Sequence, residues 1–348
     1  MRILHVITTI ERGGAENQLL VLVREQKRQN FEVEIIYLKG KNELENDFRI
    51  LGARVEAASA SRNIAKQLLT LYKETRDPSL VVHAHLPRAE LLVALAKPKA
   101  TFVISRHNAE PFFPGAPDWI SKRLSRFVAQ RASRVIAITQ TVKRYLVDSG
   151  EVPEQKEISV VHYGYPQEVH VNSRNRPSGK IGTLSRLVPQ KDLPTLLRAF
   201  KIVLREQRHL ILEIYGEGPE RKNLEDLSKE LGIQSSVKLV GRTDQVSKVM
   251  RDFDIFVLTS RYEGFGLVLL EAMSNKVPII SSNSDAAVEV LGDNFPLFFQ
   301  IGDFESLASL ILKVLHANTA GYLDYQSKRL AQFSPEKMEI NIRSIYFG

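Results

Sequence analysis

The fold is decided by residues 255–273, which read IFVLTSRYEGFGLVLLEAM. The first part, Ile255–Leu258, is an apolar run without polar alternation, which is typical of a strand covered on both faces of a parallel sheet. A loop with two glycines follows, and residues 266–275 then carry a helical pattern. Because strand, loop and helix in this order build βαβ motifs, the stretch predicts an α/β domain.

The same alternation of strand and helix extends over the whole chain. Strands are expected near residues 2–8, 32–37, 53–57, 80–84, 101–105, 134–138, 158–161, 179–185, 210–215, 236–240, 254–258, 277–281 and 295–299. Helices are expected, among others, at residues 15–29, 119–131, 193–206, 218–231, 266–275 and 303–316. The predicted fold class is α/β, with two Rossmann-like, doubly wound parallel-sheet domains that face each other across a cleft. Such sheets bind ligands at the carboxyl ends of their strands.

The domain boundary is expected between residues 163 and 180, where glycine, proline and asparagine interrupt the periodic pattern. A length of 348 residues suits two domains of about 150 residues each. We therefore expect a first domain over residues 1–165, a linker over 166–178 and a second domain over 179–332.

The composition excludes some kinds of site. Without cysteine the chain has no disulfides or thiolate metal sites, which suits a reducing cytoplasm. No apolar run approaches the roughly 20 residues that span a bilayer. We expect a cytoplasmic protein, alone or attached to the inner face of the cell membrane. The net charge of +8 favours an anionic partner such as a nucleotide, a phospholipid surface or a nucleic acid, although it also serves solubility alone.

Three predicted loops after strands carry residues suited to phosphate. Gly13 and Gly14 precede a helix whose N-terminus favours an anion, although an ordinary tight turn explains them equally well. Arg186 and Lys191 suit a diphosphate, and the alternative is a pair of solvated surface charges. The turn at Gly216 can approach a base or a phosphate, or it is a plain turn.

The loop after Ile255–Leu258 carries the strongest signal. Glu263 lies among glycines, and Glu271 lies about one turn into the following helix. The loop amides and the N-terminus of that helix can bind phosphate. The carboxylate of Glu271 can accept hydrogen bonds from both hydroxyls of a ribose, and Glu263 can reach sugar hydroxyls beyond the phosphates.

These glutamates, separated by seven residues and embedded in Glu-Gly-Phe-Gly-Leu, resemble the signature of retaining family 4 glycosyltransferases with the GT-B fold (glycosyl transferases group 1). The N-terminal glycine loop, the paired cations and the turn Gly216-Glu217-Gly218-Pro219 follow in the family's order. The resemblance spans nearly the whole chain and is most specific in the second half. It also implies that residues 333–348 form a last helix that returns to the first domain.

The resemblance implies a role for each matching residue. Glu271 would bind the donor ribose, Glu263 the donor sugar, and Arg186 and Lys191 the diphosphate. The implied donor-binding residues are Gly13, Gly14, Arg186, Lys191, Gly216, Glu263, Gly264, Phe265, Gly266, Leu267 and Glu271. The implied catalytic residues are His107, Glu263, Arg186 and Lys191, and the expected acceptor-side residues are His85, Arg106 and Asn108. By itself, a single histidine after a strand is more often structural.

The chain departs from the family pattern at two places. Residues 285–289, Asp-Ala-Ala-Val-Glu, lack the glycines of the family's Gly-Gly-Ile-Pro-Glu stretch. Val161-His162-Tyr163-Gly164 lies where the family usually has an Asn-Gly turn.

Three further patterns are interpreted as structural. Asp252-Phe253-Asp254 spells a metal-binding pattern, but it precedes its strand and so lies at the end opposite the ligand edge. His83 and His85 resemble a ligand pair, but no third ligand is expected beside them. A basic helix follows Trp119, and its apolar stripe is expected in the core, with a membrane-facing role as the alternative. The stripe consists of Ile120, Leu124, Phe127 and Val128.

The predicted function is transfer of a hexose or N-acetylhexosamine, with retention, from a nucleoside diphosphate sugar to a glycan or lipid-linked acceptor. We expect no metal and no cofactor, because Arg186 and Lys191 can stabilise the leaving phosphate. No nucleic-acid partner is expected, and an anionic membrane surface is a possible partner. The rival hypotheses are a sugar-nucleotide epimerase or hydrolase of the same fold and a nucleic-acid-binding protein.

Overall fold

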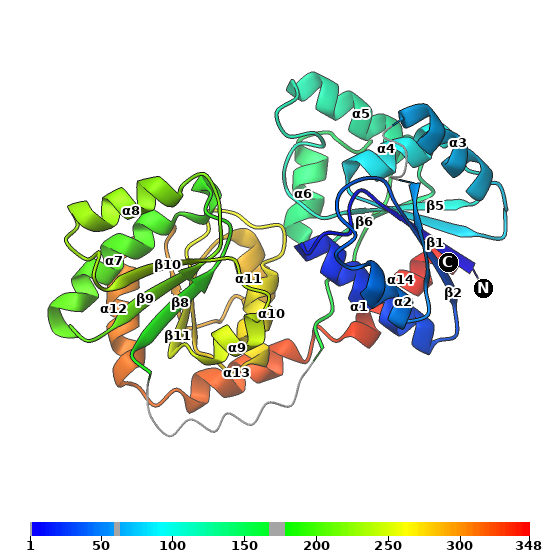
Figure 1. The fold of residues 1–348 in the computed structure, drawn as a ribbon. Coiled ribbons are helices and arrows are strands. Elements are labelled where there is room, and N and C mark those ends of the chain that lie inside the picture. Colours follow the sequence, from blue (N-terminus) through cyan, green and yellow to red (C-terminus); the bar gives the residue numbers. More distant parts are fainter. Residues whose placement is uncertain (1, 59–62, 167–177) are drawn as a thin grey trace. The chain divides into compact units, whose positions relative to one another are not determined.

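The computed structural model describes residues 2–58, 63–166 and 178–348. The chain divides into two compact units, one formed by residues 1–166 and 333–348 and the other by residues 167–332 (Figure 1). Apart from Pro166 and Ser178, the predicted linker lies outside the described residues.

The first unit contains a seven-stranded parallel sheet in the order β3-β2-β1-β4-β5-β6-β7. The strands are β1 (Arg2–Ile7), β2 (Glu32–Tyr37), β3 (Arg54–Ala57), β4 (Val81–His85), β5 (Thr101–Arg106), β6 (Arg134–Ala137) and β7 (Ile158–Val160). The helices are α1 (Gly14–Arg28), α2 (Glu45–Ile50), α3 (Ile64–Glu74), α4 (Pro87–Ala96), α5 (Asp118–Arg131), α6 (Gln140–Asp148) and α14 (Pro335–Phe347). Apolar residues of α1, α2 and the neighbouring strands form a core around Ile35 and Phe48.

The second unit repeats this architecture with a six-stranded parallel sheet in the order β10-β9-β8-β11-β12-β13. Its strands are β8 (Lys180–Leu184), β9 (Ile211–Tyr215), β10 (Val237–Gly241), β11 (Ile255–Leu258), β12 (Ile279–Ser282) and β13 (Phe298–Phe299). Its helices are the 3-10 helix η2 (Pro189–Lys191), α7 (Leu193–Glu206), α8 (Arg221–Glu230), α9 (Val246–Arg251), α10 (Leu267–Ser274), α11 (Asp285–Leu291), α12 (Phe304–His316) and α13 (Ala320–Leu330).

The predicted class, α/β with two doubly wound parallel-sheet domains, is confirmed, and every predicted strand is present. The strands were predictable because both faces of each sheet are covered, so that strands such as Ile255–Leu258 are buried at every position. In both sheets the chain order reverses beside the first strand, between β1 and β4 and between β8 and β11. Loops leave such a switch point in opposite directions and create a crevice for a ligand.

The last helix, α14, belongs to the first unit and packs against α1. Its approach depends on Gly164, because a Cβ atom there would lie 2.6 Å from the Pro335 Cα. The backbone amide of Tyr165 also donates to the Phe333 carbonyl at 2.8 Å. The glycine at this junction is therefore needed for close packing of two backbone segments.

Candidate functional site

In the second unit, hydrogen bonds hold the loops after β8 and β11 together. The Gln190 Nε2 donates to the Tyr262 carbonyl at 2.8 Å, and the Arg261 amide donates to the Gln190 carbonyl at 2.9 Å. The Thr259 hydroxyl donates to the Lys191 carbonyl at 2.7 Å. Lys191 and Glu263, which are distant in sequence, are therefore brought together at the switch point of this sheet.

Lys191 and Glu263 form a close ion pair. The Lys191 Nζ lies 2.5 Å from the Glu263 Oε1, and their side chains are only 12% and 8% exposed. Arg186 is exposed and donates from Nη2 to the Gln190 Oε1 at 3.2 Å. The sequence predicted both cations and Glu263, but it did not reveal that the glutamate pairs with Lys191 or that Gln190 joins the two loops.

Glu271 lies in α10 without a cationic partner among the described residues. Burial raises the pKa of its carboxyl from 4.5 to about 7. A buried carboxylate without a cationic partner is stabilised by hydrogen bonds from hydroxyl groups such as those of a sugar.

The glycine loop before α10 supplies backbone groups. Gly266 adopts a φ of +85° at the start of the helix, a conformation that favours glycine. Phe265 is 3% exposed, so its side chain belongs to the core and only its backbone is suited to a ligand.

The glycine turn after β9 packs directly on the loop after β8. A Cβ atom at Gly216 would lie 1.8 Å from the Ser185 carbonyl oxygen, and one at Gly218 would lie 2.2 Å from the Leu187 carbonyl oxygen. The turn therefore supports the backbone on either side of Arg186. This close packing explains why glycine is required at both positions.

Replacing Gly216 with alanine is expected to lower the free energy of unfolding by about 3 kcal/mol, because the methyl group meets a backbone carbonyl and φ is +141°. Gly232→Ala is the matched control, since Gly232 also has positive φ but its Cβ would meet nothing within 4 Å. It should cost only about 1 kcal/mol. Urea denaturation measures both, and equal losses would contradict the packing argument.

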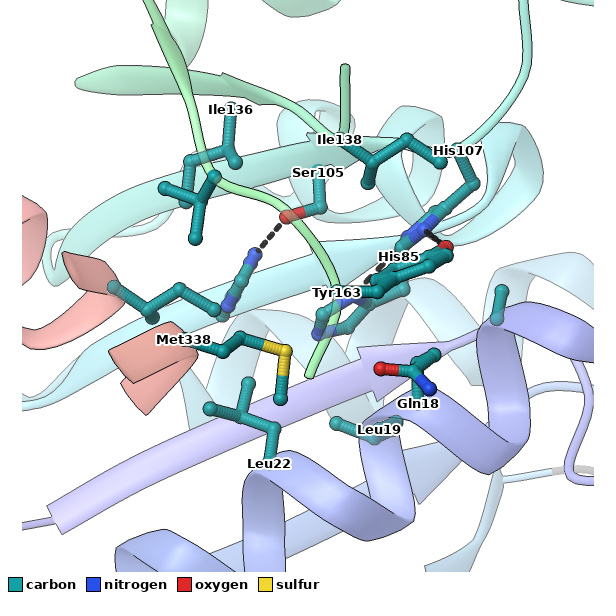
Figure 2. Close-up of a pocket in the computed structure, with 14 residues that line it drawn as sticks. Gln18, Leu19, Leu22, His85, Ser105, His107, Ile136, Ile138, Tyr163 and Met338 are labelled. Carbon is teal, nitrogen blue, oxygen red and sulfur yellow. Dashed lines mark hydrogen bonds between the residues drawn. The ribbon is translucent and has the colours of Figure 1, made fainter. Parts of the chain in front are cut away.

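In the first unit, His107 follows β5 and lies in a hydrogen-bonded group of aromatic side chains (Figure 2). Its Nδ1 lies 2.5 Å from the Tyr163 hydroxyl, and its Nε2 lies 3.4 Å from the His85 Nδ1. Burial, with a smaller contribution from Arg106, lowers the pKa of His107 to about 3, so the ring is neutral. These side chains line a pocket of about 350 Å³, counting the part open to solvent.

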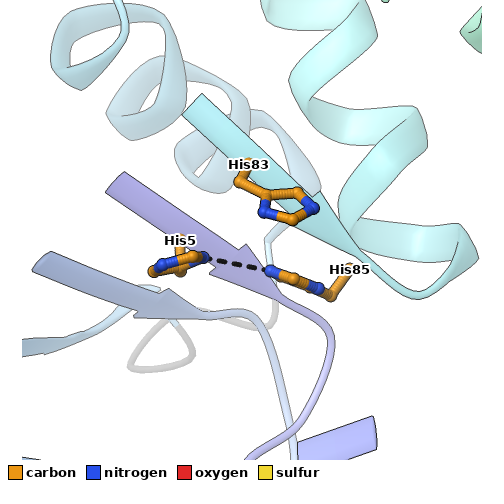
Figure 3. A group of neighbouring side chains, drawn as sticks. All are labelled: His5, His83 and His85. Atoms are coloured by element: carbon orange, nitrogen blue, oxygen red, sulfur yellow. Dashed lines mark hydrogen bonds between the residues drawn. The ribbon is translucent and has the colours of Figure 1, made fainter. Parts of the chain in front are cut away.

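The expectation that no third ligand lies beside His83 and His85 is wrong. Because β1 and β4 are neighbours in register, His5 pairs with His83 across the sheet, and its Nδ1 lies 3.0 Å from the His85 Nε2 (Figure 3). The nitrogens of all three rings have hydrogen-bond partners, which include Gln26, Ser105 and Tyr346. A metal ion there would have to replace these bonds.

The expected acceptor-side residues have different surroundings. His85 is 3% exposed, and Asn108 is exposed. The Arg106 guanidinium is buried, with its Nε 2.8 Å from Glu90 and its Nη1 3.4 Å from Glu151. An acceptor that contacts Arg106 would therefore compete with these carboxylates.

Gly13 and Gly14 form the start of α1. Gly13 is the N-cap in an extended conformation, and a Cβ atom there would lie 2.5 Å from the Glu16 Oε2. The Thr9 hydroxyl donates to the Glu16 Oε1 at 2.6 Å. An anion at this helix N-terminus would therefore meet the Glu16 carboxyl, whose pKa is raised by burial.

Two of the remaining sequence patterns have structural roles. Asp254 accepts hydrogen bonds from the backbone amides of Ser178, Gly179 and Lys180, at the edge opposite the ligand loops. Residues 285–289 form most of the helix α11.

The prediction for the basic helix α5 was wrong in detail. Its buried residues are Ser121, Ser125, Val128 and Ala129, so Val128 alone of the predicted stripe is buried. The Ser125 hydroxyl accepts from Arg106 and the Ser121 hydroxyl from the Phe113 amide, both at 2.9 Å. The apolar pattern could not predict that serines with hydrogen bonds are buried on this helix. Among the described residues, no helix has the length and apolar character that crossing a bilayer requires.

Two family models match the chain and together span residues 12–332. Glycosyltransferase Family 4 matches residues 12–169, and Glycosyl transferases group 1 matches residues 167–332. The lipopolysaccharide core biosynthesis glycosyltransferase LpsE of Rhizobium meliloti is 25% identical over 324 residues, covering 88% of this chain and 87% of that protein.

Solved structures share the fold. HepE of Anabaena, crystallised with UDP and glucose, matches with a TM-score of 0.80 at 19% identity over 99% of both chains. TarM matches with a TM-score of 0.86 at 13% identity, covering 100% of this chain and 99% of that chain. Two α/β units, each with a parallel sheet, match the GT-B fold of these structures. The chain belongs to the family 4 glycosyltransferases.

Proposed function

We propose that the enzyme transfers a hexose or N-acetylhexosamine, with retention, from a nucleoside diphosphate sugar to a glycan or lipid-linked acceptor. The observation that carries the proposal is the grouping of Lys191, Glu263 and Arg186 at the switch point of the second sheet. A cation pair there suits a diphosphate, and a carboxylate beside it suits sugar hydroxyls.

The role of each group follows from the changes in charge during transfer. Cleavage of the bond between sugar and phosphate leaves negative charge on the nucleotide, which Arg186 and Lys191 stabilise. The ammonium of Lys191 has three donors, so it can bind a phosphate oxygen while it keeps its bond to Glu263. Glu271 accepts hydrogen bonds from the ribose, and His107 lies beside the transferring sugar. We propose that transfer needs no metal, so a chelator should leave the rate unchanged.

Relatives support the biosynthetic setting. LpsE is named for lipopolysaccharide core biosynthesis, and HepE was crystallised with UDP and glucose. A UDP-sugar and a growing polysaccharide or glycolipid are therefore the first donor and acceptor to test. With a net charge of +8, the enzyme would work in the cytoplasm against the anionic inner face of the cell membrane.

A thermal-shift panel of UDP-, GDP- and ADP-sugars tests the donor. A ligand at 100 times its Kd stabilises the native protein by about 2.7 kcal/mol, so one base should raise the unfolding temperature by a few degrees. Glu271→Ala should abolish the shift, whereas Glu230→Ala, at an exposed glutamate of α8, should keep it. Absence of any shift across the panel would contradict the proposal. A product formed from the donor without acceptor would instead favour an epimerase or hydrolase.

A further inference from the structure

A continuous chain of hydrogen bonds crosses the core of the first unit, and we call it the histidine chain. It consists of Gln26, His5, His85, His107 and Tyr163, in that order. It begins where the Gln26 Oε1 lies 2.9 Å from the His5 Nε2 and ends at the Tyr163 hydroxyl. The residues come from α1, from three neighbouring strands or their ends, and from the segment after β7.

Gln26 sets the direction of the histidine chain. A neutral imidazole donates with one nitrogen and accepts with the other, so each ring can be read in either sense. A carboxamide oxygen only accepts, and therefore His5 donates from Nε2 to Gln26. His5 then accepts at Nδ1 from His85, which in turn accepts at Nδ1 from His107. The Nδ1 of His107 is left to accept from the Tyr163 hydroxyl.

The Gln26 amide has a second partner on its other side. Its Nε2 donates to the Tyr346 hydroxyl of α14 at 3.5 Å, and that hydroxyl lies 2.7 Å from the His83 Nδ1. His83 continues to the Ser105 hydroxyl, also at 2.7 Å. All four rings remain neutral because burial lowers the pKa of His5 to about 4, that of His107 to about 3 and those of His83 and His85 well below their usual value.

We propose that Gln26 is a positioning residue that acts through His5 and His85 to hold His107 in the single tautomer with its proton on Nε2. This inference rests on the proposed function, in which His107 lies beside the transferring sugar. A donor hydroxyl that bonds to His107 must replace Tyr163 at Nδ1 or His85 at Nε2. Only the replacement of His85 breaks the hydrogen bond that joins His107 to the rest of the histidine chain.

The test records long-range ¹H–¹⁵N correlations of the full-length protein labelled with ¹⁵N-histidine, together with steady-state kinetics. Wild type should show His107 only as the Nε2–H tautomer. Gln26→Met removes the fixed acceptor three hydrogen bonds away and should convert His107 to a mixture of tautomers. Tyr163→Phe should leave the tautomer unchanged, because a phenol hydroxyl can donate or accept and so does not select it. Gln26→Met should lower kcat about tenfold while the donor KM changes less than about twofold, because orientation and not binding is lost.

Gln18→Met is the matched control. Gln18 is a buried glutamine of the same helix, it lines the same pocket, and its Oε1 makes no hydrogen bond among the described residues. It should leave the tautomer of His107 unchanged.

An unchanged His107 tautomer in Gln26→Met would overturn the inference. A changed tautomer with unchanged kcat would confirm the coupling and refute the placement of His107 at the donor sugar. The two measurements therefore distinguish a failure of the proposed function from a failure of the coupling along the histidine chain.

Discussion

Lys191→Met is expected to reduce kcat by about 100- to 1000-fold, because it removes a cation that stabilises charge on the departing phosphate. The same change leaves Glu263 buried without its partner, since the pair is 2.5 Å apart and nearly inaccessible. Removing one partner of a buried pair costs about 3 kcal/mol or more of stability. The variant should therefore lose activity and stability together, as measured by initial rates at saturating donor and by urea denaturation.

The double variant Lys191→Met with Glu263→Gln separates the two effects. Neutralising both partners should restore most of the stability, because no unpaired charge remains buried. It should not restore turnover. Lys180→Met is the control, because Lys180 is also a lysine paired with a glutamate, Glu213, but it begins β8 at the opposite edge of the sheet. If Lys191→Met turned over within about threefold of wild type, the phosphate role would be refuted.

Glu271→Gln is expected to weaken donor binding about 100-fold while it stabilises the free enzyme at alkaline pH. Hydrogen bonds to a charged acceptor contribute about 1.5–3 kcal/mol, and an amide cannot accept both ribose hydroxyls in the same way. In the native enzyme the pKa of Glu271 is raised from 4.5 to about 7 by burial. The native state therefore binds a proton more tightly than the unfolded chain, and stability falls as pH rises from 4.5 to about 7.

The size of the stability gain follows from the same shift. A pKa change of this extent corresponds to roughly 3 kcal/mol, and partial exposure of Glu271 reduces the expected gain to about 2 kcal/mol. Urea denaturation at pH 8 should show this gain, and at pH 4.5 it should vanish. Wild-type donor affinity should rise with pH through 7 as the carboxylate ionises. A variant less stable than wild type at pH 8 would show that the carboxylate has a partner in the free enzyme.

The parts of the fold that depend on local pattern were predictable. Apolar strands such as Ile255–Leu258 and the glycine loops after them identify βα units without knowledge of the sheet order. Lys191 and Glu263 could be assigned to ligand loops because parallel strands place their carboxyl ends at one edge. Their pairing, however, depends on β8 and β11 being neighbours, which no local pattern reveals.

The histidine chain was missed for the same reason. His5 and His85 are 80 residues apart in sequence, and only the adjacency and register of β1 and β4 place them together. Arg106 shows a second limit, because an arginine after a strand suggests an exposed ligand contact, whereas here Glu90 and Glu151 bury it. The roles of individual site residues in transfer stay predictions.

The central claim is that the diphosphate of a nucleotide sugar binds to Arg186 and Lys191 while its ribose binds to Glu271. The most direct measurement is a crystal structure of the protein with a nucleoside diphosphate. We expect phosphate oxygens within about 3.2 Å of both cations and a ribose hydroxyl on the Glu271 carboxylate. A nucleotide bound elsewhere on the protein, or with its phosphates out of reach of Arg186 and Lys191, would contradict the claim.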